Sequence, residues 1–325
     1  MILFDFIISI YYNKTMHKNN LVECDDGMFL APPEVIAKLD HPEYTTAPPP
    51  ANIDQVKIEF GRLSVLLTRR CNQPEDMCPH CICGEPQSID LDQSAINAFF
   101  RKNRIAKIVQ LVFFGGETSL NGRGANHFSD QLTGSGIPLR DAWAATNGLL
   151  HSVQLAEAMA KLNSIQTSKY GYGIIVSTDN YHVPFEQEAI KQYQDSLGIG
   201  LVGFDRSRHT PRNVTPMGRA VQLMIDAGID PAEVYRLRDE HIQRMIREVQ
   251  PIFERRETSG EIVIEMPYTT ELAANGKIGL LKSVDYATAD KYALFDVRQQ
   301  GFASALYRYG LVKRRNDADE VCAAN

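Results

Sequence analysis

The stretch "TRRCNQPEDMCPHCICGE", residues 68–85, places four of the chain's six cysteines within thirteen positions. It follows directly on "RLSVLLT", residues 62–68, a short run of aliphatic and β-branched residues typical of a buried strand. A strand that ends in a thiol-rich loop is a suitable place for a metal or a disulfide. Three structures could use these thiols: a disulfide, a zinc site and an iron–sulfur cluster.

The cysteine spacing leaves two of these alternatives open. Cys71, Cys78 and Cys81 form a C-x6-C-x2-C pattern, and Cys83 follows two residues later. Zinc sites often combine two ligand pairs from separate loops, but no second C-x2-C pair follows Cys78–Cys81, so zinc would need Cys71, Cys83 or His80 from the same loop. Three thiolates from one loop also fit an iron–sulfur cluster that keeps one iron without a protein ligand. A disulfide is disfavoured because the chain resembles a cytosolic protein.

Composition limits the class of protein. The chain has 325 residues, of which 44% are hydrophobic, enough for one large α/β domain or two smaller ones. Its net charge of −6 argues against a dedicated nucleic-acid binder. The apolar run at residues 1–12 is shorter than the roughly 20 residues that span a bilayer, and it lacks the features of a signal peptide. We therefore expect a cytoplasmic protein without a membrane partner, with residues 1–12 as an edge strand or a loosely attached extension.

Apolar runs and amphipathic patterns alternate along most of the chain. Residues 31–50 contain six prolines and predict an extended connector. The alternation that follows predicts βαβ units and a parallel sheet buried on both faces, in a doubly wound sheet or an incomplete (β/α) barrel. The helix at 230–253 has the clearest start, with Asp230 as N-cap, Pro231 in the first turn and Glu233 placed for a capping box. Strands are expected at 62–68, 108–114, 141–146, 172–178, 200–204 and 261–266, and helices at 88–103, 152–165, 184–197 and 230–253.

Unusual polar residues follow the expected strands. In both candidate architectures the chemistry gathers at the carboxyl ends of the strands. The cysteines follow the first strand, "GGE" (115–117) the second, "TNG" (146–148) the third and "STDNYHVP" (177–184) the fourth, while a basic loop (206–219) follows the fifth. These groups therefore fall where one shared site would lie.

A three-cysteine loop, then "GGE", "TNG" and "STD" at successive strand ends, resembles the radical S-adenosylmethionine (radical SAM) superfamily over residues 62–280. The first cysteine gap is three residues longer than that family's usual C-x3-C-x2-C, a surface insertion of low entropic cost. The resemblance implies a partial (β/α)6 TIM-like barrel in which Cys71, Cys78 and Cys81 hold a [4Fe–4S] cluster. The free iron of that cluster would bind the amino and carboxylate groups of S-adenosylmethionine.

The resemblance also implies roles for other residues. Gly115, Gly116 and Glu117 would receive the methionine amino group, and Ser177 and Asp179 would contact the ribose. His80 would lie near the adenine, and Arg219, in "PMGRA", would bind the cofactor's carboxylate or an anionic substrate. Tyr181 and His182 are candidates to donate a proton or hydrogen atom to the substrate. Cys83 has no role in the family pattern, and as a small apolar side chain it fits a buried position.

The sequence thus predicts an N-terminal extension and connector (1–60), a radical SAM-like core (61–260) and a C-terminal extension (261–325). "ELAANGKIGL", residues 271–280, resembles the strand–turn–strand of radical peptide-modifying enzymes, but only Cys322 follows it, so auxiliary clusters are not expected. We expect an enzyme that cleaves S-adenosylmethionine with an electron from a flavodoxin or ferredoxin and acts on a peptide, a protein or a small molecule. The alternatives are a zinc-stabilised, non-catalytic binding protein on the same barrel and a nucleic-acid binder that uses the loop at 206–219.

Overall fold

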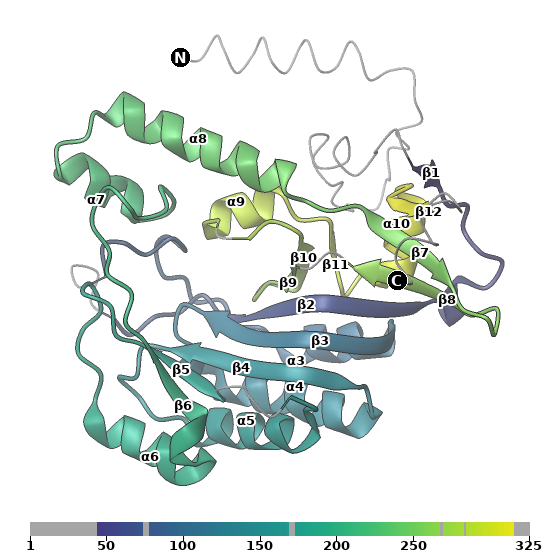
Figure 1. The fold of residues 1–325 in the computed structure, drawn as a ribbon, viewed down its shortest axis with the longest axis horizontal. Helices are drawn as coiled ribbons and strands as arrows, with labels where there is room; N and C mark the ends of the chain where they lie inside the picture. The colour runs from purple at the N-terminus through teal and green to yellow at the C-terminus, as the bar shows by residue number, and fades with distance from the viewer. Residues whose placement is uncertain (1–43, 74–77, 169–172, 267–268, 283, 315–325) are drawn as a thin grey trace.

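The computed structural model describes residues 44–73, 78–168, 173–266, 269–282 and 284–314. The extension expected at residues 1–12 and most of the proline-rich connector lie outside these ranges. Five strands lie side by side and parallel in chain order, and the last of them forms one edge of the sheet (Figure 1). They are β2 (Lys57–Thr68), β3 (Arg104–Gly115), β4 (Leu139–Thr146), β5 (Ile174–Ser177) and β6 (Val202–Asp205).

Four helices cover one face of these strands (Figure 1). They alternate with the strands, and their apolar sides meet the sheet in one core, in which the rings of Phe99 and Phe113 both pack on Phe128. This arrangement confirms the mixed α/β class and the mostly parallel sheet predicted from the alternating pattern. The helices are α3 (Gln93–Arg101), α4 (Gly122–Ser135), α5 (Val153–Ile165) and α6 (Gln187–Leu197).

Helix α4 was not expected from its glycine-rich sequence. The Asn121 side chain caps it by accepting a hydrogen bond from the backbone of Gly124 at 3.1 Å, and Phe128 and Leu132 on its inner side are fully buried. Gly122 allows the helix to lie close to the start of α5, because a Cβ there would lie 2.1 Å from Ser152 Oγ. Burial of one apolar side therefore outweighs the low helix propensity of glycine.

The expected sixth strand pairs with the first strand. β8 (Ile262–Met266) is parallel to the first half of β2, and β9 (Thr270–Leu272) is parallel to its second half. β9 and β10 (Lys277–Gly279) form the predicted strand–turn–strand, with Gly276 at a φ of 82°. The sheet continues from β8 through β7 (Ile252–Arg256) and β12 (Val312–Arg314) to β1 (Thr45–Thr46), while β11 (Phe295–Asp296) pairs with β10.

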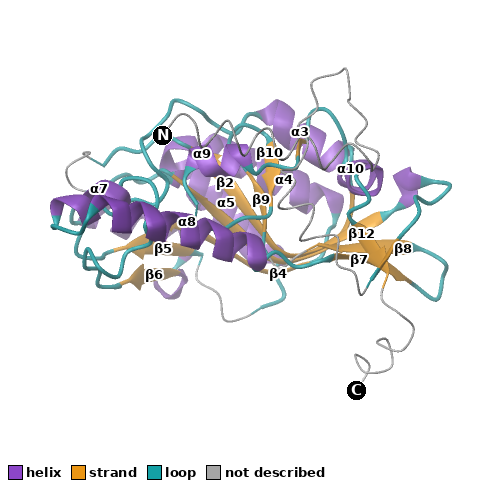
Figure 2. Ribbon diagram, turned by 90° about the horizontal axis from the view of Figure 1, so that it is seen from above, coloured by secondary structure: helices purple, strands orange, loops and turns teal. Residues whose placement is uncertain are grey.

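Helix α8 (Pro231–Arg247) begins where it was predicted and ends earlier. Asp230 accepts a hydrogen bond from the backbone of Ala232 at 2.8 Å, whereas the expected capping-box residue, Glu233, pairs with Arg236. Pro251 follows the helix, and the residues after it belong to β7. Seen from above, α7 (Ala220–Asp226) and the start of α8 lie at the same end of the molecule as β5 and β6 (Figure 2). The remaining short helices are α9 (Tyr286–Lys291) and α10 (Phe302–Arg308).

None of the helices in the described ranges is both long enough and apolar enough to cross a membrane.

Candidate functional site

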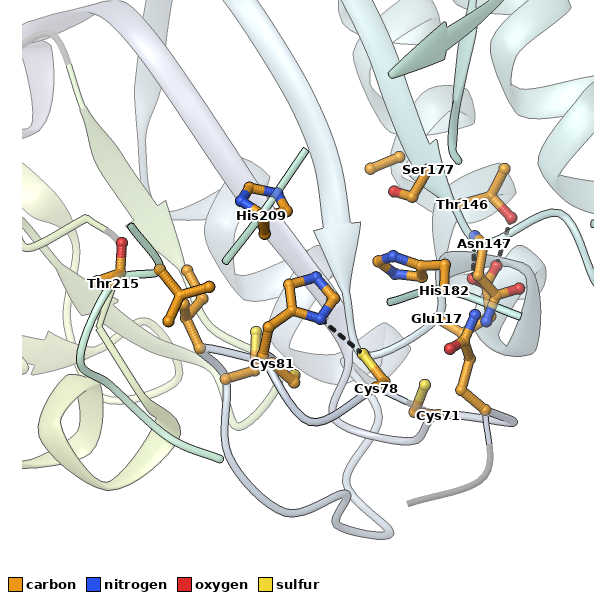
Figure 3. Close-up of a pocket in the computed structure, with 18 of the residues that line it drawn as sticks. Cys71, Cys78, Cys81, Glu117, Thr146, Asn147, Ser177, His182, His209 and Thr215 are labelled. Atoms are coloured by element: carbon orange, nitrogen blue, oxygen red, sulfur yellow. Dashed lines mark hydrogen bonds between the residues drawn. The ribbon is translucent and has the colours of Figure 1, made fainter. Parts of the chain in front are cut away.

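The carboxyl ends of the central strands surround one pocket of about 350 Å³ (Figure 3). The strand ends therefore share one site, as the sequence predicted, and the proposed roles of its residues stay predictions. Tyr181, Asp179 and Arg219 are not part of the pocket lining, although each contacts a residue that is. Among the predicted residues, the lining includes Cys71, Cys78, His80, Cys81, Gly115, Gly116, Glu117, Ser177 and His182.

The two glycines at the end of β3 lie against the start of the loop that follows β2 and carries the four clustered cysteines, called the cysteine loop below. The backbone N–H of Gly116 donates to Thr68 O at 2.8 Å, and that of Glu117 donates to Arg70 O at 2.8 Å. A Cβ on Gly116 would lie 2.1 Å from Arg70 O, and one on Gly115 would lie 2.5 Å from Thr68 O. The glycines are required because the two backbones approach this closely, so any larger residue would displace the cysteine loop.

The carboxylate of Glu117 joins the ends of β3 and β4. This side chain is 1% exposed and accepts three hydrogen bonds: from Ser119 N at 2.9 Å, from Thr146 Oγ1 at 2.7 Å and from Asn147 N at 2.7 Å. The side-chain amide of Asn147 donates in turn, through Nδ2, to Asn72 Oδ1 in the cysteine loop at 2.8 Å. "GGE" and "TNG" are therefore coupled parts of one hydrogen-bonded unit that positions the cysteine loop.

The thiols of the loop interact with one another. Cys78 is 5% exposed, and hydrogen bonds from the Cys78 and Cys83 thiols lower the pKa of Cys81. The same hydrogen bonds, together with burial, raise the pKa of Cys78 and of Cys83. Burial also raises the pKa of Cys71. Cys81 is therefore the thiol that this environment favours as a thiolate, the form that binds metals.

Arg219 supplies the positive charge beside these sulfurs. Its backbone N–H donates to Cys81 O at 2.9 Å, and its guanidinium contacts the Cys81 sulfur and contributes to lowering the pKa of Cys81. Gly218 makes this approach possible, because it has a φ of 55° and a Cβ there would lie 2.5 Å from Gly84 N. Arg219 is 9% exposed and, in this structure, stabilises the loop's negative charge. Its contact with the cofactor's carboxylate stays a prediction.

Three histidines from different loops meet at one wall of the pocket. The ring of His80 lies 5.1 Å from that of His182, 5.2 Å from that of His209 and 4.9 Å from that of Tyr181. Asp179 Oδ2 lies 2.6 Å from His182 Nδ1 and 3.4 Å from His80 Nε2. Burial opposes ionisation of Asp179, but the backbone of Tyr181 and the neighbouring histidines still lower its pKa. Asp179 therefore orients His182, and sequence patterns gave no reason to select His209.

Gln73 is a pocket residue that the sequence did not single out. Its side chain is 5% exposed, and in the described part of the chain neither its Nε2 nor its Oε1 has a hydrogen-bond partner. An unpaired buried amide costs about 1–3 kcal/mol, and such groups are rare in native proteins. Its position in the pocket lining leaves this amide available to a ligand that supplies both a donor and an acceptor.

A buried ion pair connects the residue that follows β2 with helix α9. Arg69 is 2% exposed, makes two hydrogen bonds to Asp290 at 2.6 and 2.8 Å, and lies over the ring of Tyr286. The backbone N–H of Tyr286 donates to Cys83 O at 3.1 Å. Burial raises the pKa of the nearby Glu271 to about 7, while Arg69 opposes the rise. Residues expected in the C-terminal extension thus support the cysteine loop directly.

No protein-family model and no curated protein sequence matches the chain. Comparison with solved structures finds BtrN in complex with AdoMet and 2-DOIA (14% identity, TM-score 0.42, covering 82% of this chain and 86% of BtrN). It also finds anSMEcpe with bound AdoMet (11% identity, TM-score 0.43, covering 77% of this chain and 80% of anSMEcpe). A third match is Streptococcus suis SuiB bound to the precursor peptide SuiA (12% identity, TM-score 0.41, covering 94% of this chain and 77% of SuiB). At these identities and TM-scores the likeness carries no argument about this chain, and its activity has to be argued from the site.

Proposed function

We propose that the chain is a radical SAM enzyme, carrying one [4Fe–4S] cluster and binding S-adenosylmethionine in the pocket at the strand ends. The observation that supports this most strongly is the placement of Cys71, Cys78 and Cys81, from one loop, in the lining of that pocket (Figure 3). Gly115 and Gly116 line the same pocket. When bound, such a cluster supplies the electron that cleaves S-adenosylmethionine to methionine and a 5′-deoxyadenosyl radical, which takes a hydrogen atom from the substrate.

The donor set and the pocket fit these groups. Iron–sulfur clusters take Cys thiolates, and Arg219 beside Cys81 offsets part of the negative charge that three thiolates bring. The unpaired amide of Gln73 offers a donor and an acceptor to a polar ligand. The neighbouring Glu117 carboxylate already accepts three hydrogen bonds, so in this proposal it positions the site instead of binding the ammonium group.

The remaining residues have assignable tasks within this proposal. The backbone at Gly115 and Gly116 would receive the methionine amino group, and Ser177 would contact the ribose. His182, which contacts Asp179, would hold or move a proton at this wall of the pocket, and Tyr181, stacked on His80 outside the pocket lining, is the second candidate. The proposed location is the cytoplasm, the electron donor a flavodoxin or ferredoxin, and the substrate a peptide or a small molecule.

Metal analysis together with a cleavage assay tests the proposal. The full chain is reconstituted with iron and sulfide without oxygen, its metals are assayed, and a strong reductant and S-adenosylmethionine are added. We expect about four irons per chain and release of 5′-deoxyadenosine. Finding zinc in place of iron, with no 5′-deoxyadenosine formed, would overturn the proposal.

A zinc-stabilised binding protein is a second candidate, and one observation favours it. The ligand atoms of Cys78, His80 and His182 lie within 4.8 Å of one another, and a Cys/His set is typical of zinc. Zinc there would give a colourless protein that binds one metal per chain and is insensitive to oxygen. A His182→Ala variant separates the two candidates. It should lower the zinc content of a zinc-stabilised binding protein and leave the iron content of a radical SAM enzyme unchanged.

Gln73→Leu should weaken S-adenosylmethionine binding and leave the unliganded protein at least as stable. Leucine fills a similar volume and removes an amide that has no partner among the described residues, so the free energy of unfolding should not fall. The bound cofactor would lose its hydrogen bonds to Gln73, which should raise the dissociation constant about tenfold, or by about 1.4 kcal/mol.

Calorimetric titration and thermal unfolding of the reconstituted protein measure the two effects. Gln154→Leu, at an exposed position on α5, is the matched control. It should change neither the dissociation constant for S-adenosylmethionine nor the free energy of unfolding. A Gln73→Leu protein that binds S-adenosylmethionine normally would show that the amide does not contact the cofactor.

A further inference from the structure

A second cavity lies beside the pocket at the strand ends. It is a groove of about 560 Å³ between the segment at 212–216 and the helices α7 and α8. This segment separates the two spaces: Arg212 and Pro216 line the groove, Asn213 and Thr215 line the pocket, and Val214 lines both. A molecule in the groove would therefore reach the mouth of the pocket without crossing another element.

The groove has an excess of positive charge in a chain whose net charge is −6. Arg212, Arg244 and Arg247 line it, and among the described residues neither Arg212 nor Arg247 forms an ion pair. Arg244 uses one nitrogen to donate to His241 Nδ1 at 2.8 Å. The acidic lining residue, Glu240, pairs with Arg236 on the same helix. Guanidinium groups that lack carboxylate partners are suited to bind carboxylates of another molecule.

The groove is long and partly apolar. Leu237 and Arg247 both line it and lie about 15 Å apart along α8, at 1.5 Å per residue. An extended chain covers about 3.3–3.6 Å per residue, so the groove has room for about four residues of a peptide. Val214, Met224 and Leu237 give it an apolar side, which a peptide can contact and a free phosphate cannot.

We propose that this groove binds an acidic stretch of a peptide substrate, next to the pocket in which the substrate's reacting side chain would lie. The charge selects carboxylates, the length selects an extended chain, and the shared residue Val214 connects binding with the site. The inference rests on the proposed function only in treating the bound peptide as a substrate, since the groove itself needs neither cluster nor cofactor.

Calorimetric titration of the reconstituted full chain with a hexaglutamate peptide tests the proposal, with hexaglutamine and pyrophosphate as the other probes. We expect hexaglutamate to bind and hexaglutamine not to bind. Arg244→Gln combined with Arg247→Gln should weaken hexaglutamate binding about tenfold, or by about 1.4 kcal/mol, and Arg212→Gln should weaken it separately. Arg123→Gln, an exposed position on α4, removes the same charge elsewhere and should leave the affinity unchanged.

Three results would overturn the inference: equal binding of hexaglutamine, tighter binding of pyrophosphate than of hexaglutamate, or unchanged affinity in the groove variants. Because this titration needs no reductant and no S-adenosylmethionine, it is independent of the cleavage assay. A protein that binds hexaglutamate but forms no 5′-deoxyadenosine refutes the proposed function and leaves the groove assignment standing. A protein that forms 5′-deoxyadenosine but does not bind hexaglutamate refutes the groove assignment and leaves the proposed function standing.

Discussion

Replacing Cys78 by alanine should abolish cluster incorporation while leaving the fold intact. Cys78 lines the pocket, is 5% exposed and donates to Cys81, so its loss removes one proposed ligand and one hydrogen bond to a second. A cluster held by three thiolates does not form stably on two, and iron should fall from about four to well below one per chain. Cys78 lies in a loop outside the sheet, so circular dichroism should show unchanged secondary structure.

Cys83→Ala is the matched control for this prediction. Cys83 is close to the same loop sulfurs, but its environment includes Tyr286 and a small apolar cluster, where an alanine can be accommodated. This variant should retain its iron and its cleavage of S-adenosylmethionine. Full iron in the Cys78→Ala protein would refute the proposed ligand, and loss of iron in Cys83→Ala would mean that Cys83 belongs to the ligand set.

Local patterns in the sequence were sufficient to predict the five parallel strands and where they end, but β2 and β3 begin earlier than the expected residues 62 and 108, at Lys57 and Arg104. The second halves of β2 and β3 and most of β5 are apolar runs, and each is followed by polar or glycine-rich residues that cannot continue a buried strand. Since parallel strands place their carboxyl ends on one edge, the order of the motifs alone brings the cysteines, "GGE" and "TNG" together. This is why the pocket could be located without a structure.

Contacts between distant segments could not be predicted in the same way. No local signal states that β8 pairs with β2, because that register depends on which edge of the sheet remains available. The same limit applies to the contact of Asp179 with His80, because the two residues lie in different loops. Gln73 resembles any polar loop residue until its burial is known. The residues missed are thus those whose roles come from packing.

Glu117→Gln should destabilise the protein even in the absence of any cofactor. The native carboxylate accepts three hydrogen bonds in a site that is 1% exposed, and one of its oxygens would become an NH2 group facing the donors Thr146 or Asn147. Leaving buried donors unpaired in this way should cost about 2–4 kcal/mol. For a chain of 325 residues the melting temperature should fall by roughly 3–6 °C.

Thermal unfolding of the unreconstituted protein distinguishes this positioning role from a role in cofactor binding. Glu188→Gln, an exposed position on α6 that accepts a hydrogen bond from Gln192, is the control and should change the free energy of unfolding by no more than about 0.5 kcal/mol. A Glu117→Gln protein that melts normally but no longer binds S-adenosylmethionine would make Glu117 a cofactor ligand, as the family resemblance implies. A protein that melts early and regains cofactor binding at low temperature would show instead that the glutamate acts by holding the ends of β3 and β4 together, and that the cysteine loop depends on this connection for its position.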